Sequence, residues 1–205
     1  DHEDAKFDTN QVTVMGRLSS EKAYDDMLRV FVKVLEQNPS AHLNIVGDGE
    51  ERHNLSVLAD RLGIADSVTF YGNKVGKEKS QILENTSVFV TTSHYESFGL
   101  VLLEAMDYGI PCLSFDSAKG SLDIIEDGKD GYIKNRDLDQ MANKLVELLN
   151  NPSKELSKNA KDKANSYSYK NVRKQWLDAF KNMNIHDLKT RVMFTSSAGG
   201  HYSEL

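Results

Sequence analysis

The feature that most constrains the fold of this chain is the alternation of short apolar runs with longer amphipathic segments. The short runs predict strands, whereas the longer segments repeat apolar residues at the 3.6-residue period of a helix. Glycine follows several of the predicted strands. Strand and helix units joined by short turns favour a parallel sheet with helices on both faces. The sequence therefore predicts an α/β fold.

The predicted strands lie at residues 11–15, 42–46, 67–71, 87–91, 112–115 and 131–133. The predicted helices lie at residues 20–37, 50–62, 77–84, 99–108, 138–150, 153–166 and 169–183, with a short helical turn at 122–126. Ser19 or Ser20 would cap the first helix, and Gly63 would close the second.

Composition excludes several classes of protein. The chain has 205 residues and a net charge of -6, which argues against a broad nucleic-acid footprint. Cys112 is the one cysteine, so no intrachain disulfide can form. No run approaches the roughly 18 apolar residues of a membrane span, and the acidic residues 1–4 do not resemble a secretory signal. These features favour a reducing, cytoplasmic setting.

Glu96 and Glu104 are the most informative pair for function. Glu96 precedes a turn that contains Gly99, and Glu104 lies about two turns into the apolar helix that follows. Backbone N–H groups and the dipole at a helix N-terminus favour a bound phosphate. Carboxylates accept hydrogen bonds from hydroxyls instead. A phosphate cradle flanked by two hydroxyl acceptors suits a sugar nucleotide.

Arg17 and Lys22 follow the first predicted strand, where two cations can converge on one diphosphate. Taken by itself, this pair also fits two solvated surface charges. Ser19 and Lys22 match the S-x-x-K pattern of acyl-serine enzymes, but the partner motifs of those enzymes do not occur, so we set that pattern aside.

Other patterns carry less weight. The glycine pair Gly47 and Gly49 would need a third glycine at position 52, where Arg52 stands, so NAD binding is not expected. Asp137 and Asp139 match the D-x-D pattern of metal-dependent sugar transferases, but a helix cap explains them better. The six histidines show no metal-ligand spacing. We predict no metal and no cofactor.

Several segments together resemble the C-terminal half of a family 4 retaining glycosyltransferase of the GT-B type. The strongest is residues 96–111, and the others are residues 14–22, 43–49 and 68–72. The resemblance covers about residues 6–182. It implies a Rossmann-like donor-binding domain that holds a nucleotide-diphosphate sugar, most commonly a UDP-sugar. The loop at residues 116–121 is similar to that of many bacterial capsule and exopolysaccharide members.

The resemblance implies a role for each matched residue. Arg17 and Lys22 would bind the diphosphate and stabilise its charge as it leaves, Glu96 would bind the sugar hydroxyls, and Glu104 would hold the ribose. Transfer would retain the anomeric configuration. The remaining donor-binding candidates are Gly16, Gly47, Asn73, Lys74, Ser97, Phe98, Gly99 and Leu100. One departure is Ala23, which stands where the family usually has glycine; a helix would accommodate it.

The implied domain organisation has three parts. Residues 1–183 would form the donor domain and residues 184–190 a linker. Residues 191–205 would begin a second Rossmann-like unit, because they resemble the start of the small subunit of two-part, membrane-associated sugar transferases. A docked or disordered tail is the open alternative. The acceptor, a glycan or lipid-linked saccharide, would bind an N-terminal domain that this sequence lacks.

We therefore predict the donor domain of a retaining, metal-independent transferase of bacterial surface-polysaccharide synthesis. It would work in the cytoplasm, with a peripheral location at the inner face of the membrane for the parent protein, and would bind no nucleic acid. Two alternatives stay open. One is an inactive module or fragment that only binds a nucleotide, and the other is half of a sugar-nucleotide enzyme such as a 2-epimerase.

Overall fold

The computed structural model describes residues 3–182, which fall into two units. The first ends at Tyr167, and the second begins at Ser168. The strands of the first unit are β1 (Gln11–Met15), β2 (His42–Val46), β3 (Val68–Gly72), β4 (Val88–Thr91), β5 (Cys112–Phe115) and β6 (Gly131–Lys134). The predicted linker at 184–190, the predicted second unit at 191–205 and Met183 lie outside the described residues.

Helices connect these strands. The first unit contains η1 (Ser20–Lys22), α1 (Tyr24–Gln37), α2 (Arg52–Arg61), η2 (Ala65–Ser67), α3 (Gly76–Glu84), α4 (Leu100–Asp107), α5 (Lys119–Ile124), α6 (Leu138–Asn150) and α7 (Lys154–Ser166). The second unit contains α8 (Tyr169–Asn182). Within residues 3–182, no helix is long and apolar enough to cross a membrane.

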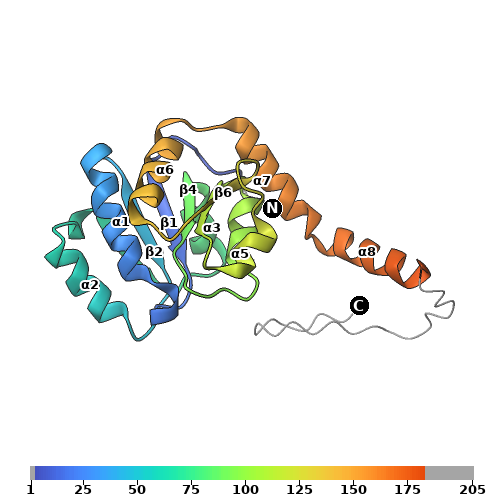
Figure 1. Cartoon of the computed structure of the whole chain (residues 1–205), viewed down its shortest axis with the longest axis horizontal. Coiled ribbons are helices and arrows are strands. Elements are labelled where there is room, and N and C mark those ends of the chain that lie inside the picture. Colours follow the sequence, from blue (N-terminus) through green and yellow to red (C-terminus); the bar gives the residue numbers. More distant parts are fainter. Residues whose placement is uncertain (1–2, 183–205) are drawn as a thin grey trace. The chain divides into compact units, whose positions relative to one another are not determined.

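The strands form one sheet in the order β3-β2-β1-β4-β5-β6, and every neighbouring pair is parallel (Figure 1). This confirms the predicted α/β fold with a parallel sheet. The chain first moves outward from β1 to β3 and then returns to place β4 on the other side of β1. The direction of winding therefore changes between β1 and β4, and ligands of such sheets bind at that point, beyond the carboxyl ends of the strands.

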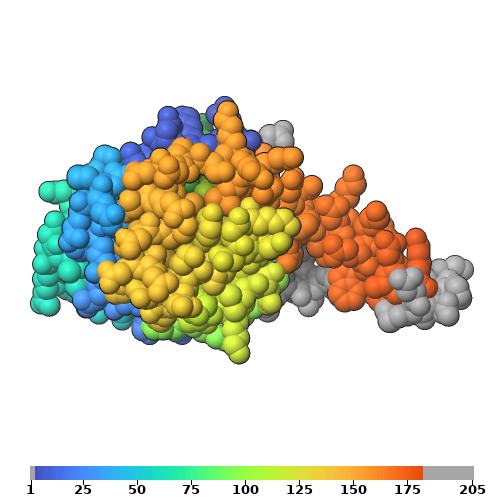
Figure 2. Space-filling view, turned by 45° about the horizontal axis from the view of Figure 1, so that its top comes forward, coloured from blue at the N-terminus to red at the C-terminus, as the bar shows by residue number. Residues whose placement is uncertain are grey.

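Helices cover both faces of the sheet. On one face, side chains of α1, α2 and α6 join the β1 and β2 residues Val12, Val14, Leu43 and Ile45 in one apolar cluster. The surfaces of α1 and α6 lie side by side (Figure 2). On the other face, a second cluster joins α3, α4, α5 and α7 to Phe89 and Cys112 of β4 and β5. Burial on both faces is what a parallel sheet requires.

The helix predicted at residues 20–37 is interrupted. Ala23 adopts a left-handed conformation with φ of 48° and separates η1 from α1. Neither Ser19 nor Ser20 therefore caps α1, and Ala23 does not lie within a helix as predicted. A left-handed residue is most easily a glycine, so this conformation fits the glycine that the resemblance led us to expect here.

The helical turn predicted at 122–126 begins earlier, at Lys119, so α5 takes in part of the predicted loop at 116–121. The reason is a close tertiary contact at Gly120. Its backbone N–H donates to the carbonyl oxygen of Glu96 at 2.8 Å. A Cβ at Gly120 would lie 2.6 Å from the backbone nitrogen of Phe98. A contact with a segment about 24 residues away is invisible to local periodicity.

Candidate functional site

Lys22 and Glu96 meet where the winding of the sheet changes direction. Lys22 ends η1 just after β1, and Glu96 lies in the loop after β4. Lys22 Nζ donates to Glu96 Oε2 at 2.5 Å, and the two side chains are 23% and 15% exposed. The partners are 74 residues apart in sequence. Two of the residues predicted to carry the chemistry therefore form one partly buried ion pair.

Tyr24 lies beside this pair. Burial of its phenol, together with the negative charge of Glu96, raises the pKa of Tyr24 well above its ordinary value. A Cβ at Gly16 would lie 3.1 Å from the Tyr24 hydroxyl oxygen. Gly16, Tyr24 and the Lys22–Glu96 pair are therefore close together after β1.

The turn from Glu96 to Leu100 directs the start of α4 toward the same region. Gly99 has φ of 82° and immediately precedes Leu100, the first residue of α4. The Gly120 contact holds this turn from one side, and the Phe98 ring packs edge-on against Tyr167 with centroids 6.0 Å apart. The N–H groups of the first turn of α4 and its dipole can therefore attract an anion near Glu96.

Arg17 is placed differently from the prediction of two converging cations. Its side chain is 74% exposed and pairs with Glu50 at 3.1 Å. Glu50 receives a hydrogen bond from its own backbone N–H, and this bond together with Arg17 lowers the pKa of Glu50. The structure brings Lys22 to Glu96 and leaves Arg17 at the rim.

The loop that carries Arg17 crosses the loop after β2 at very close range. The Leu18 N–H donates to the Asp48 carbonyl oxygen at 2.9 Å. A Cβ at Gly47 would lie only 1.9 Å from the Gly16 carbonyl oxygen. Gly16 and Gly47, both predicted site residues, are thus in backbone contact at the carboxyl ends of β1 and β2.

Glu104, Asn73 and Lys74 lie on other elements around this end of the sheet. Glu104 is on α4 and pairs with Lys79 of α3 at 3.2 Å. Asn73 and Lys74 follow β3, and Lys74 pairs with Glu78 at 2.5 Å. The structure does not join these residues directly to the Lys22–Glu96 pair.

Arg136, which the sequence did not single out, links three loops and the start of α1. Its guanidinium pairs with Asp26 of α1, donates to the Thr92 carbonyl at 3.0 Å and to the Ser117 hydroxyl at 3.2 Å. The Thr92 hydroxyl in turn lies within hydrogen-bond distance of the Lys22 carbonyl, at 3.0 Å. Thr92, Ser117 and Arg136 each follow closely the end of a strand, so the rule that ligands bind at carboxyl ends could have identified them.

One of the weaker sequence patterns is structural. Asp137 caps α6, because its side chain accepts hydrogen bonds from the backbone N–H groups of Asp139 and Gln140. This confirms the cap interpretation of the D-x-D pattern. Among the described residues, no group of three or more His, Cys, Asp or Glu side chains is arranged to hold a metal ion.

Comparison with known proteins gives a consistent result. The family model described as "Glycosyl transferases group 1" matches residues 2–167. An uncharacterized glycosyltransferase of Haemophilus influenzae is 32% identical over 166 residues, which is 80% of this chain and 46% of that protein. A poly(ribitol-phosphate) alpha-N-acetylglucosaminyltransferase of Staphylococcus aureus is 29% identical, over 81% of this chain and 34% of that protein.

The fold also matches solved structures. A crystal structure of an S. aureus TarM mutant, in complex with Fondaparinux, alpha-GlcNAc-glycerol and UDP, superimposes with a TM-score of 0.77 and 26% identity. The match covers 88% of this chain and 37% of that one. The chain therefore spans less than half the length of each of these three proteins.

Proposed function

The chain belongs to the group 1 glycosyl transferases, and from that membership we propose that it binds the UDP-sugar donor of a retaining transfer reaction. The observation that carries the proposal is the Lys22–Glu96 pair beside the start of α4. A cation and a helix N-terminus attract a diphosphate. A carboxylate accepts hydrogen bonds from sugar hydroxyls. The site thus has one group for each half of a sugar nucleotide.

The proposed chemistry follows from charge. When the bond between the anomeric carbon and the diphosphate oxygen breaks, its electron pair stays on the diphosphate. Lys22, the N–H groups at the start of α4 and Arg17 at the rim then stabilise that negative charge. Preorganised charges of this kind require no metal ion. The acceptor oxygen forms the new bond to the anomeric carbon, and its proton passes to the departing diphosphate oxygen.

The other proposed roles rest on position. Glu104 would bind the ribose hydroxyls, and Gly16 and Gly47 allow the chain to approach the nucleotide closely. Asn73 and Lys74 would border the base. The N–H groups for the sugar and phosphates would come from Ser97, Phe98, Gly99 and Leu100.

The wider setting is also a proposal. The S. aureus relative is named for an alpha-linked product on poly(ribitol-phosphate), and retention of an α-linked donor would give such a product. We place this chain in bacterial surface-polysaccharide synthesis, at the cytoplasmic face of the membrane. The acceptor glycan would contact the part of a longer protein that this chain does not span.

The test is calorimetric titration of the chain with UDP and with UDP-N-acetylglucosamine. Replacing Glu96 by Gln should weaken binding of the sugar nucleotide by about tenfold to a hundredfold, because a charged hydrogen-bond acceptor for the sugar is lost. Binding of free UDP should be unchanged or stronger, since the substitution also releases Lys22 from its ion pair. Equal losses for both ligands would contradict the proposed role of Glu96.

Arg17→Ala should weaken both ligands, because both carry the diphosphate. Arg29, an exposed arginine on α1, provides the matched control, and Arg29→Ala should bind both ligands as the natural chain does. Full affinity in Arg17→Ala would remove Arg17 from the site.

A further inference from the structure

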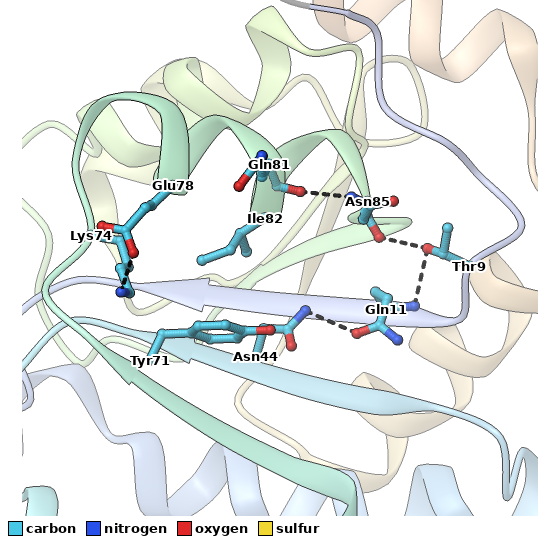
Figure 3. A pocket seen from close by; sticks show the side chains of 9 residues that line it. All are labelled: Thr9, Gln11, Asn44, Tyr71, Lys74, Glu78, Gln81, Ile82 and Asn85. Atoms are coloured by element: carbon cyan, nitrogen blue, oxygen red, sulfur yellow. Dashed lines mark hydrogen bonds and ion pairs between the residues drawn. The ribbon is translucent and has the colours of Figure 1, made fainter.

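A cavity of ≈ 540 Å³ lies between the sheet and α3 (Figure 3). Neither Lys22 nor Glu96 lines it. This volume is within the range of about 300–1,000 Å³ found for small-molecule sites. The sheet side of the cavity is formed by β1, β2 and β3, and α3 forms the opposite side. Its lining residues are Thr9, Gln11, Asn44, Tyr71, Lys74, Glu78, Gln81, Ile82 and Asn85.

The sheet face beneath this cavity is polar, which is unusual for a parallel sheet. Over β4 and β5, the same face carries Phe89 and Cys112 in an apolar cluster. Over β1 and β2 it carries Gln11, Thr13 and Asn44. Polar side chains at these positions depart from the apolar pattern of a parallel sheet, and such departures often mark functional sites.

Asn44 has an unused hydrogen-bond acceptor. The residue is 4% exposed, and its side-chain amide group donates to Gln11 Oε1 at 3.1 Å and to Thr13 Oγ1 at 3.4 Å. The Thr86 hydroxyl donates to the Ile82 carbonyl at 2.8 Å, so the Thr13 hydroxyl must donate to Thr86 and can only accept from Asn44. This series of hydrogen bonds fixes the orientation of the Asn44 amide. Its Oδ1 is left without a partner, and buried acceptors rarely stay so.

The charge of the cavity indicates the class of ligand. Its one cation, Lys74, is paired with its one anion, Glu78, at 2.5 Å. The remaining polar lining consists of amide and hydroxyl groups, which both donate and accept hydrogen bonds, as sugar hydroxyls do. Tyr71 is 38% exposed and offers a flat ring for the apolar face of a sugar.

We propose that this cavity is a second site, which adjoins the proposed donor site at Lys74 and binds a neutral saccharide. The amides of Gln11 and Gln81 would contact the sugar hydroxyls, and the ring would stack on Tyr71. Asn44 Oδ1 is closed to solvent in the structure, so a sugar hydroxyl would donate to it only after neighbouring side chains move. An anionic ligand is disfavoured because the cavity offers no unpaired cation. The site would hold a segment of glycan away from the reacting centre.

The test is a titration of the isotope-labelled chain with N,N′-diacetylchitobiose, followed by NMR of the side-chain amides of Asn44, Gln11 and Gln81. We expect saturable shifts at millimolar sugar. Tyr71→Ala and Gln81→Ala, both at exposed positions, should weaken binding by about tenfold or more. Tyr169→Ala, which removes an exposed tyrosine from α8, should bind as the natural chain does.

The same titration in saturating UDP separates this site from the donor site. The shifts should persist, because the proposed saccharide does not occupy the nucleotide position. Loss of the shifts with UDP would assign the cavity to the donor site and overturn the proposal. Absence of any shift, or shifts that survive both substitutions at the cavity, would overturn it as well.

Discussion

Gly47 shows how a single residue controls the proposed donor site. Its φ of 134° lies in the region that side chains disfavour, and a Cβ would stand 1.9 Å from the Gly16 carbonyl oxygen. At Gly49, a Cβ would lie 2.4 Å from the Leu18 carbonyl oxygen. Two glycines after β2 therefore allow the loop after β1 to contact the loop after β2 through backbone atoms. This contact fixes the backbone position of Arg17.

Gly47→Ala should lower the free energy of unfolding by more than about 3 kcal/mol, because strain in φ and a backbone clash act together. Nucleotide binding should fall with it, since the loop before Lys22 must shift. Chemical denaturation and UDP titration measure the two effects.

Gly63→Ala is the matched control. Gly63 has φ of 70° but open space around its Cβ position, so only the conformational cost of about 1–2 kcal/mol should appear, with UDP binding intact. A similar cost for both variants would show that the crossing of the two loops is not tight.

At the scale of the elements, α6 depends on the cap at its N-terminus. Asp137 Oδ1 accepts from the N–H groups of Asp139 at 2.8 Å and Gln140 at 3.1 Å. The bond from Gln140 is the largest of the effects that lower the pKa of Asp137 below its ordinary value of 3.8. A lowered carboxyl pKa stabilises the fold above the ordinary value, and this contribution is lost as pH falls through the lower value.

Asp137→Ala should therefore destabilise the chain at neutral pH, and the difference from the natural chain should shrink below about pH 3.8. Asp137→Asn keeps a capping oxygen without a titrating group, so it should cost less and show a weaker pH dependence. Thermal unfolding at a series of pH values measures both. A difference that stays constant to low pH would rule out the charged cap.

The elements also explain why Arg136 joins three loops to α1. Parallel strands end at the same edge, so the residues that follow β4, β5 and β6 converge there. The Arg136 guanidinium can donate several bonds in fixed directions, and it also lies over the Phe115 ring at 5.1 Å. One side chain thus holds the loops that surround the Lys22–Glu96 pair.

At the scale of the whole molecule, Cys112 reports on the integrity of the first unit. It is fully buried in β5, and burial raises the pKa of its thiol well above the ordinary value. The thiolate is the reactive form, so alkylation requires the surrounding sheet and helices to open.

Iodoacetamide should therefore label Cys112 at least about a thousandfold more slowly in the native chain than in the denatured chain. UDP at a hundred times its dissociation constant should slow labelling by about a further hundredfold, because it binds only the native state. Mass spectrometry follows the reaction. If labelling of the native chain is only a few-fold slower than labelling of the denatured chain, the sheet opens locally around β5.

Much of the fold could be predicted from local sequence. The strands β1, β2 and β5 and the helix α6 have the predicted bounds, because short apolar runs and capping residues act within a few positions. The break at Ala23 was missed, since apolar periodicity continues through it. The early start of α5 was missed because Gly120 is held by the distant Glu96.

The sequence by itself determined the kinds of group available: Lys22 after one strand, Glu96 before a glycine turn, and an apolar helix after it. Tertiary structure alone decided that Lys22 pairs with Glu96, that Arg17 pairs with Glu50, and that polar residues of β1 and β2 line a cavity under α3. The reason is physical. Local patterns depend on contacts between near neighbours, whereas these pairings depend on strand order, which places residues 74 positions apart side by side.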